Sequence, residues 1–271
     1  MNHDQMPLSH SIDVTQPSVA RMHNYYLGGK DNYPADRQVC ERLLEHAPST
    51  QILTINNRRF LQRVIRHLIL EHGVRQFLDI GAGLPTRDNV HEIAQRYTGD
   101  ARVVYIDNDP MVLAYGRALL EDNDQTAVIQ ADLRDPEGIL DHPRVADLLD
   151  LSQPVAALYV SVLHCVPDDA APAALVRRAA ARLCPGSLLV ISQLVSEDAA
   201  TRHVITDFMR ESTGGNWGAV RRTKDVSSFF TGLDILEPGL VDVSTWRTDA
   251  SLDPRQHTRE WIEYGGVGRV P

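Results

Sequence analysis

Short apolar runs that carry aspartates, with a glycine turn beside the first of them, are the segments of this chain best able to do chemistry. Asp79 lies in the run Phe77-Leu78-Asp79-Ile80, which leads directly into Gly81-Ala82-Gly83. Asp107 closes the next apolar run, and Asp132 follows the one after it. Two glycines after a strand let the backbone bend tightly and approach a ligand where a Cβ would intrude. Because carboxylates accept hydrogen bonds from hydroxyl and amino groups, the pattern is typical of a nucleoside-binding edge.

The positions of the carboxylates along the chain indicate which part of a nucleoside each would bind. Asp107 lies 24 residues after Gly83 (107 − 83), close to the offset of about 20 residues at which a carboxylate holds ribose hydroxyls. Asp132 is placed to accept a hydrogen bond from the exocyclic amine of adenine, with the amide of Leu133 nearby. Taken singly, each aspartate is more typical of a turn that ends a strand. Three of them at successive strand ends favour a nucleoside site.

The same turn argues against a dinucleotide. A dinucleotide fingerprint has a third glycine three residues after the second, but Thr86 stands there and Pro85 lies inside the turn. Asp79 would repel a pyrophosphate, whereas it suits a cationic amino group. The residues therefore favour a sulfonium nucleoside with an amino-acid end over a nicotinamide dinucleotide. A nicotinamide-dependent oxidoreductase remains the enzymatic alternative.

Hydrophobic periodicity predicts the elements that position these residues. Three helices are expected first: one from Pro17 or Ser18 to Gly28-Gly29, one from Pro34 to Pro48, and one from Ser49 or Thr50 to Gly73. Apolar runs then alternate with helical stretches, which indicates parallel strands with crossover helices. We expect strands at 76–80, 103–106, 127–130, 155–160 and 187–192, and helices near 89–97, 110–120, 170–183 and 199–211. The segments 233–236, 240–243 and 261–265 predict a turn-linked antiparallel edge.

Composition and charge exclude several classes of protein. The 271 residues carry a formal net charge of −9, which repels phosphate backbones and anionic membranes, so we expect neither nucleic acid nor a membrane as a partner. The three cysteines form no C-x-x-C pair and the eleven histidines no H-E-x-x-H motif, so no metal is expected. The polar N-terminus and the absence of a long apolar stretch predict a cytoplasmic protein.

The chain resembles the class I S-adenosylmethionine-dependent methyltransferases. Within that class it is most similar to the actinobacterial S-adenosyl methyltransferase family, formerly described as a domain of unknown function. The matching segments extend from about Pro17 to Arg269 and comprise 17–22, 27–33, 57–61, 76–86, 104–110, 130–135, 161–164, 238–241 and 264–267. The resemblance implies an α/β fold with a Rossmann-like doubly wound sheet, mostly parallel with a late antiparallel strand, plus an N-terminal helical lid.

The resemblance also implies a cofactor, S-adenosylmethionine, with S-adenosylhomocysteine as its product, and roles for individual residues. It carries Asp79, Gly81 and Gly83 to the methionyl part, Asp107 and Asn108 to the ribose and its surroundings, and Asp132 and Leu133 to the adenine. The segment from Ser161 to His164 would border the methyl group. The chain departs from the family pattern at Tyr25-Tyr26 and in residues 260–263, which leaves the methyl acceptor open.

The expected organisation is a flexible arm at 1–16, an N-terminal helical lid at 17–75 and a Rossmann-like methyltransferase domain at 76–271. Within the lid, Tyr25, Lys30, Asn32 and Tyr33 offer aromatic faces and polar tips. We expect them to cover the cofactor, exclude water and shape the acceptor pocket. An ordinary helix hairpin with a glycine cap is the alternative.

His164 is the candidate catalytic base. Methyl transfer from a sulfonium is an in-line displacement, so holding the acceptor about 3 Å from the methyl group supplies much of the rate. A hydroxyl or protonated amine acceptor would gain from a base near neutral pKa, and His164 follows the fourth strand. Its ring could instead cap the helix start at 167–169 or pack on the adenine.

Taken together, these patterns predict an S-adenosylmethionine-dependent methyltransferase that acts on an unidentified small-molecule acceptor. The alternative from another class is a non-catalytic sensor that binds S-adenosylmethionine or S-adenosylhomocysteine without turnover.

Overall fold

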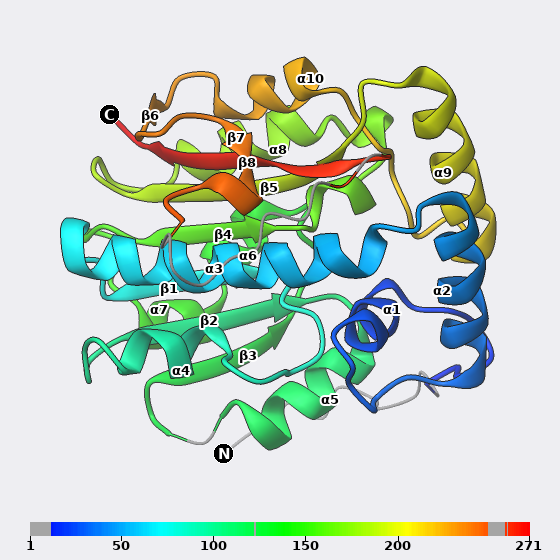
Figure 1. The fold of residues 1–271 in the computed structure, drawn as a ribbon. Helices are drawn as coiled ribbons and strands as arrows, with labels where there is room; N and C mark the ends of the chain where they lie inside the picture. The colour runs from blue at the N-terminus through cyan, green and yellow to red at the C-terminus, as the bar shows by residue number, and fades with distance from the viewer. Residues whose placement is uncertain (1–11, 122, 249–257, 259) are drawn as a thin grey trace.

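A twisted sheet crosses the centre of the molecule, with helices on both faces (Figure 1). The computed structural model describes residues 12–121, 123–248, 258 and 260–271. Its strands are β1 (Gln76–Ile80), β2 (Arg102–Asp107), β3 (Thr126–Gln130), β4 (Ala156–Val160), β5 (Leu188–Val195), β6 (Asp234–Ile235), β7 (Val241–Asp242) and β8 (Ile262–Arg269). Its α-helices are α1 (Val19–Tyr26), α2 (Pro34–His46), α3 (Thr50–His72), α4 (Val90–Gln95), α5 (Pro110–Leu119), α6 (Pro136–Leu140), α7 (Pro143–Leu148), α8 (Pro172–Ala180), α9 (Ala199–Ser212) and α10 (Thr223–Ser227). Short 3₁₀ turns are η1 (Leu163–Cys165), η2 (Asp168–Ala170), η3 (Ser228–Phe230) and η4 (Val243–Thr245).

The order in which strands are added to the sheet reverses at β1. Within the described ranges the sheet has eight strands in the order β3-β2-β1-β4-β5-β8-β6, and β7 also pairs with β8. The strands β1 to β5 run parallel, and β8 runs antiparallel to β5. The chain adds β2 and β3 on one side of β1 and then crosses back to add β4 on the other side. In such sheets ligands bind in the crevice outside the carboxyl ends of the strands at this reversal.

Two apolar layers attach the helices to the sheet. On one face Phe60 and Leu68 of α3 pack with Phe77 of β1 and with Trp246, and all four side chains are buried. On the other face Val176 of α8 belongs to a second layer, which includes Ile80 of β1 and Tyr159 of β4. Figure 1 shows α3 and α4 on the near side of the sheet. The three- and four-residue spacing of the buried α3 positions is what turns one stripe of that helix toward the strands.

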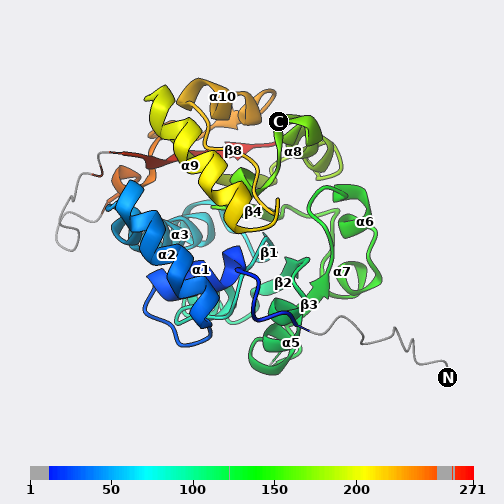
Figure 2. The same cartoon turned by 90° about the vertical axis from the view of Figure 1, so that its right-hand side faces the viewer.

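Helices α1 and α2 lie beyond the carboxyl ends of the parallel strands, next to α9 (Figure 2). Met22 and Tyr26 of α1 share an apolar cluster with Leu43 of α2 and Met209 of α9. Gly28, just after α1, has a φ of +76°, a conformation that glycine adopts without steric cost. Helices α1 and α2 therefore lie at the edge of the sheet that carries the predicted aspartates.

Most predicted elements are confirmed. The three N-terminal helices and the five parallel strands begin and end within about three residues of the expected positions, as do α5 and α9. The short helices α6, α7 and α10 were not expected, because five or six residues are too few to show a helical period. Residues 1–11 of the predicted flexible arm lie outside the described residues, and the division at residue 75 stays a prediction.

The antiparallel addition is confirmed, but its expected place at the edge is wrong for β8. That strand lies inside the sheet, between β5 and β6. A Cβ on Gly265 would lie 1.8 Å from the carbonyl oxygen of Ile191, and one on Gly268 would lie 2.8 Å from Leu233. Glycines at these positions let neighbouring segments approach closely, so β8 fits between two partners.

Candidate functional site

The glycine turn after β1 is shaped by its neighbours. Gly81 and Gly83 have φ angles of +76° and +67°. The amides of Gly81 and Ala82 donate to the carbonyl of Ile106, at 2.8 and 3.1 Å. A Cβ on Gly81 would lie 2.2 Å from Val162, so only glycine fits between β1 and the segment after β4. The turn is therefore fixed beside β1, where the strand order reverses.

Asp107 connects this turn to the end of β2. Its Oδ2 accepts a hydrogen bond from the amide of Gly83 at 2.9 Å, and its Oδ1 accepts one from the amide of Asp109 at 2.9 Å. Burial raises the pKa of Asp107, and the two backbone N–H groups act in the opposite direction. Each oxygen keeps a second lone pair. The carboxylate is thus oriented by backbone groups and can still accept from ligand hydroxyls.

Asp79 lines a pocket with Gly83, Arg58 of α3 and His23 of α1. The Asp79 side chain is buried, and among the described residues no hydrogen bond or ion pair reaches its carboxylate. Burial raises the pKa of Asp79 to about 7; the charge of Arg58 lowers it and that of Asp107 raises it. A buried carboxylate without a partner is costly. The pocket therefore suits a ligand that brings a cationic group to Asp79.

Arg58 and His23 were not predicted from the sequence. Arg58 donates from Nη2 to the carbonyls of Arg87 (3.0 Å) and Asp88, whereas its buried Nε has no partner among the described residues. Burial lowers the pKa of His23 to about 4, and the charge of Arg58 acts in the same direction, so His23 is neutral at physiological pH. A signal for Arg58 was present: it occupies a position three and seven residues before Leu61 and Ile65, on the apolar stripe of a helix.

The predicted adenine and ribose residues lie along the same edge but engage different partners. The carbonyl of Asp107 accepts a hydrogen bond from Ala131, which brings the segment after β3 to the end of β2. Asp132 forms an ion pair with Arg134 and its side chain is 34% exposed. Leu133 packs against the apolar layer that includes Ile129. Asn108 is exposed, and its carbonyl accepts from Gln130. Asp132 is therefore accessible to a ligand only in competition with Arg134.

Ser161 follows β4 and holds a buried acid that sequence reasoning missed. Ser161 has a φ of +57°, which is uncommon outside glycine. Its amide donates to the Oγ of Ser192 at 2.9 Å, and its own Oγ donates to Oε1 of Glu263. Burial raises the pKa of Glu263 to about 7, and the hydrogen bond from Ser161 lowers it. Oε2 of Glu263 is buried and has no partner within the described ranges.

The predicted lid residues differ in what they contact. Tyr33 packs with Leu84 of the glycine turn and with Met111 of α5. Asn32 is buried and donates to Oδ1 of Asn24 and to the carbonyl of Gly29, both at 3.0 Å. Tyr25 stacks edge-on against Tyr26, and Lys30 is exposed. Tyr33 is thus the predicted lid residue that reaches the sheet edge, while Asn32 uses its polar groups within the lid itself.

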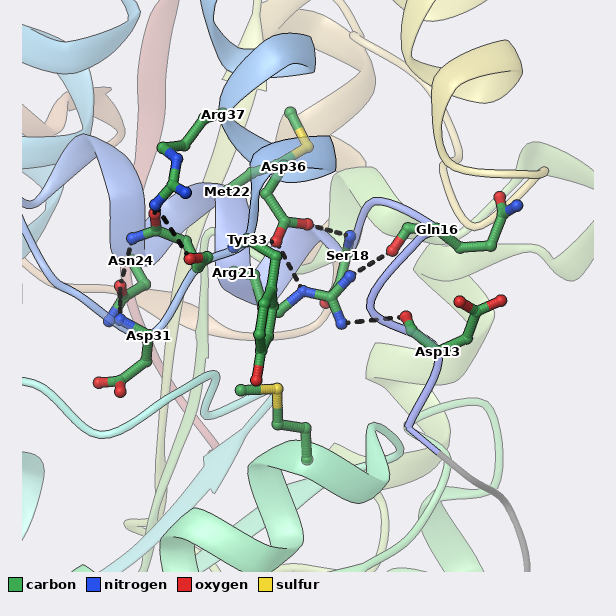
Figure 3. Close-up of polar contacts among 12 residues, drawn as sticks. Asp13, Gln16, Ser18, Arg21, Met22, Asn24, Asp31, Tyr33, Asp36 and Arg37 are labelled. Atoms are coloured by element: carbon green, nitrogen blue, oxygen red, sulfur yellow. Dashed lines mark hydrogen bonds and ion pairs between the residues drawn. The ribbon is translucent and has the colours of Figure 1, made fainter.

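A buried ion pair and a hydroxyl tie α1 and α2 to each other and to α5. The Nε of Arg21 donates to Asp36 at 2.8 Å, and both side chains are at most 4% exposed. The amide of Ser18 also donates to Asp36, at 2.9 Å, and the Ser18 hydroxyl donates to Asp109 at 2.9 Å. Figure 3 shows Tyr33 beside the Arg21–Asp36 pair. Because the Asp109 amide donates to Asp107, Ser18 is linked through Asp109 to the predicted ribose site.

His164 is buried. Its ring lies 4.6 Å from that of Trp217, and its Nδ1 has no partner among the described residues. Burial lowers the pKa of His164 to about 3, with the charge of Arg221 acting in the same direction. The alternative in which the ring caps the segment at 167–169 is wrong, because no hydrogen bond joins them within the described ranges and the ring packs on Trp217 instead. The catalytic role stays a prediction.

Neither a metal cluster nor a membrane-spanning helix occurs among the described residues. Within them, no group of three or more histidine, cysteine, aspartate or glutamate side chains is placed to hold a metal ion. In the same part of the chain, no helix has the length and apolar character needed to span a membrane.

The glycine turn, the free Asp79 carboxylate and the oriented Asp107 fit a nucleoside with a cationic amino-acid end. A model of the S-adenosyl methyltransferase family matches residues 5–271. A candidate methyltransferase from Thermobifida fusca is 40% identical, with 96% of this chain and 97% of that chain covered and a TM-score of 0.89. A DUF574 family protein from Streptomyces avermitilis is 38% identical, with 96% and 100% covered and a TM-score of 0.89.

A more distant structure, the mitomycin 7-O-methyltransferase MmcR, is 15% identical, with 95% of this chain and 74% of that chain covered and a TM-score of 0.53, and it shows the fold alone. No curated protein matches the sequence. Nothing in these comparisons supports the sensor or the nicotinamide enzyme considered above. The chain belongs to the S-adenosyl methyltransferase family and is an S-adenosylmethionine-dependent methyltransferase.

Proposed function

We propose that this enzyme methylates a small-molecule acceptor, bound between helices α1 and α2 and the carboxyl ends of the strands. The observation that carries the proposal is that Asp79 and Gly83 line one pocket with His23 of α1, while Asp107 accepts a hydrogen bond from the amide of Gly83. Helices α1 and α2 lie beyond this edge, and a site that they cover would suit a small molecule better than a polymer. A net charge of −9 is also unfavourable for a nucleic-acid substrate.

Each side chain has a proposed role in positioning the reactants. When bound, S-adenosylmethionine supplies an electrophilic methyl group on a sulfonium and a neutral leaving group. Asp79 pairs with the α-ammonium, Gly81 and Gly83 admit the methionyl chain, and Asp107 accepts from the ribose hydroxyls. Further proposed contacts are Asn108 near the ribose, Asp132 and Leu133 at the adenine, and Ser161 at the methyl group. Tyr25, Lys30, Asn32 and Tyr33 form the lid, which excludes water.

The acceptor class can be tested with radiolabelled S-adenosylmethionine. The enzyme is incubated with three fractions of an extract from its own organism: dialysable metabolites, nucleic acids and proteins. We expect label to enter the metabolite fraction, because the lidded site admits a small molecule. The Asp107→Ala variant is the control for transfer by other enzymes. Label that enters nucleic acid or protein, and depends on Asp107, would contradict the proposal.

The hydroxyl of Ser18 gives a test of the lid. Ser18→Ala removes the hydrogen bond to Asp109 but no side-chain cap, because the Ser18 hydroxyl does not cap α1. One such bond contributes about 1 kcal/mol, so we expect S-adenosylhomocysteine to dissociate roughly five times faster, as measured by stopped-flow fluorescence. Ser152→Ala, before β4 at the opposite edge of the sheet, is the matched control. Equal dissociation rates for wild type and Ser18→Ala would remove the lid role from this contact.

A further inference from the structure

The pocket beside the glycine turn is lined by two side chains of opposite charge that do not form an ion pair with each other. Arg58 and Asp79 both line it, and the charge of Arg58 lowers the pKa of Asp79. No ion pair joins the two side chains among the described residues. Oppositely charged groups close together but unpaired suit a ligand that itself carries both charges. The amino-acid end of the cofactor, with its α-ammonium and α-carboxylate, is such a ligand.

The guanidinium of Arg58 is held in place by hydrogen bonds, and its Nε–H group has no acceptor among the described residues. The Nη2 group is fixed by two backbone carbonyls, those of Arg87 and Asp88, in the segment that follows the glycine turn. The Nε–H is buried without an acceptor. A buried donor without a partner is unfavourable, so a ligand oxygen at this position would be favoured. Arginine presents its N–H groups in a planar fork that matches a carboxylate.

The segment held by Arg58 has other supports. Gln62 donates to Oδ2 of Asp88 at 3.1 Å, and Arg96 forms an ion pair with the same carboxylate. The amide of Thr86 is bound by Asn89 at 2.9 Å. If Arg58 served only to hold this segment in place, it would repeat what Gln62, Arg96 and Asn89 already do. The unused Nε–H is better explained by a ligand.

We infer that Arg58 binds the α-carboxylate of the cofactor, so that Arg58 and Asp79 together select a cofactor with a complete amino-acid end. This inference rests on the proposed binding of the methionyl group at Asp79. His23 of α1, neutral and next to Arg58, covers this end of the pocket from the lid side. The site would then discriminate against decarboxylated S-adenosylmethionine, which keeps the ammonium and sulfonium but lacks the carboxylate.

Calorimetry with two ligands tests the inference. S-adenosylhomocysteine carries the amino-acid end, whereas 5′-methylthioadenosine has the same nucleoside and sulfur without it. We expect Arg58→Gln to weaken S-adenosylhomocysteine binding by roughly 10- to 100-fold, the range for hydrogen bonds to charged groups. Binding of 5′-methylthioadenosine should change by less than about threefold. Arg66→Gln, an exposed position on the same helix, should leave both affinities unchanged.

Other outcomes separate this inference from the proposed function. If Arg58→Gln weakens both ligands equally, or neither, then Arg58 does not read the carboxylate and the inference fails. If the wild type does not bind S-adenosylhomocysteine at all, the proposed cofactor site fails instead. Two further measurements do not depend on how well Arg58→Gln folds. Wild type should bind decarboxylated S-adenosylmethionine at least tenfold more weakly than S-adenosylmethionine, and Arg58→Lys, which keeps the charge without the fork, should lose only part of this preference. Equal binding of the two cofactors by wild type would overturn the inference.

Discussion

Asp107→Ala should weaken S-adenosylhomocysteine binding by roughly 100-fold or more in isothermal titration calorimetry. The carboxylate is proposed to accept from two ribose hydroxyls, and each hydrogen bond to a charged group contributes about 1.5 to 3 kcal/mol. The substitution also releases the amides of Gly83 and Asp109, both held at 2.9 Å. Loss of the ligand contacts and loosening of the glycine turn therefore act in the same direction.

Controls for this prediction separate binding from folding. Asp124→Ala removes an exposed carboxylate before β3 and should leave the affinity unchanged. Asp107→Asn keeps the shape and one acceptor oxygen, so its loss of affinity should be intermediate. Thermal unfolding of each unliganded variant shows whether the fold is intact. An affinity of Asp107→Ala within twofold of the wild type would remove Asp107 from the cofactor site.

Relative to wild type, the Glu263→Gln variant should gain stability against unfolding as the pH rises. Burial keeps the Glu263 proton on the folded protein up to about pH 7, whereas a free glutamate has a pKa of 4.5. Because the folded pKa is raised, this group contributes most to stability below pH 4.5, and the contribution is lost as the pH rises toward 7. From pH 5 to pH 8 we expect wild type to lose on the order of 2 to 3 kcal/mol relative to Glu263→Gln.

The measurement is the free energy of unfolding in urea for both proteins at pH 5 and pH 8. Only the change in their difference is interpreted, because other groups titrate equally in both. Glutamine still accepts from the Ser161 hydroxyl, so the network around Ser161 is kept. Glu211→Gln, exposed on α9, is the matched control and should show no pH-dependent difference. A difference between wild type and Glu263→Gln that stays constant with pH would show that Glu263 is ionised in the folded protein at pH 5.

The local sequence determined the elements and the cofactor class. Proline and glycine limit the first three helices, since Pro34 starts α2 and Gly73 ends α3, and backbone constraints of this kind act within a few residues. The run from Phe77 to Gly83 predicted a strand, a turn and a ligand edge together. Side-chain alternation and turn chemistry are local properties, so they can be read without knowledge of the fold.

Only the tertiary structure decided which distant side chains meet. Arg58 lies 21 residues before Asp79 (79 − 58) and His23 lies on α1, yet both line one pocket. Glu263 reaches Ser161 because β8 inserts beside β5. His164 had the residue type and position of a base, but burial beside Trp217 lowers the pKa of its ring and so makes it a weaker base. Burial, pKa and partner choice depend on contacts between elements far apart in the chain, and no local pattern of residues encodes those contacts.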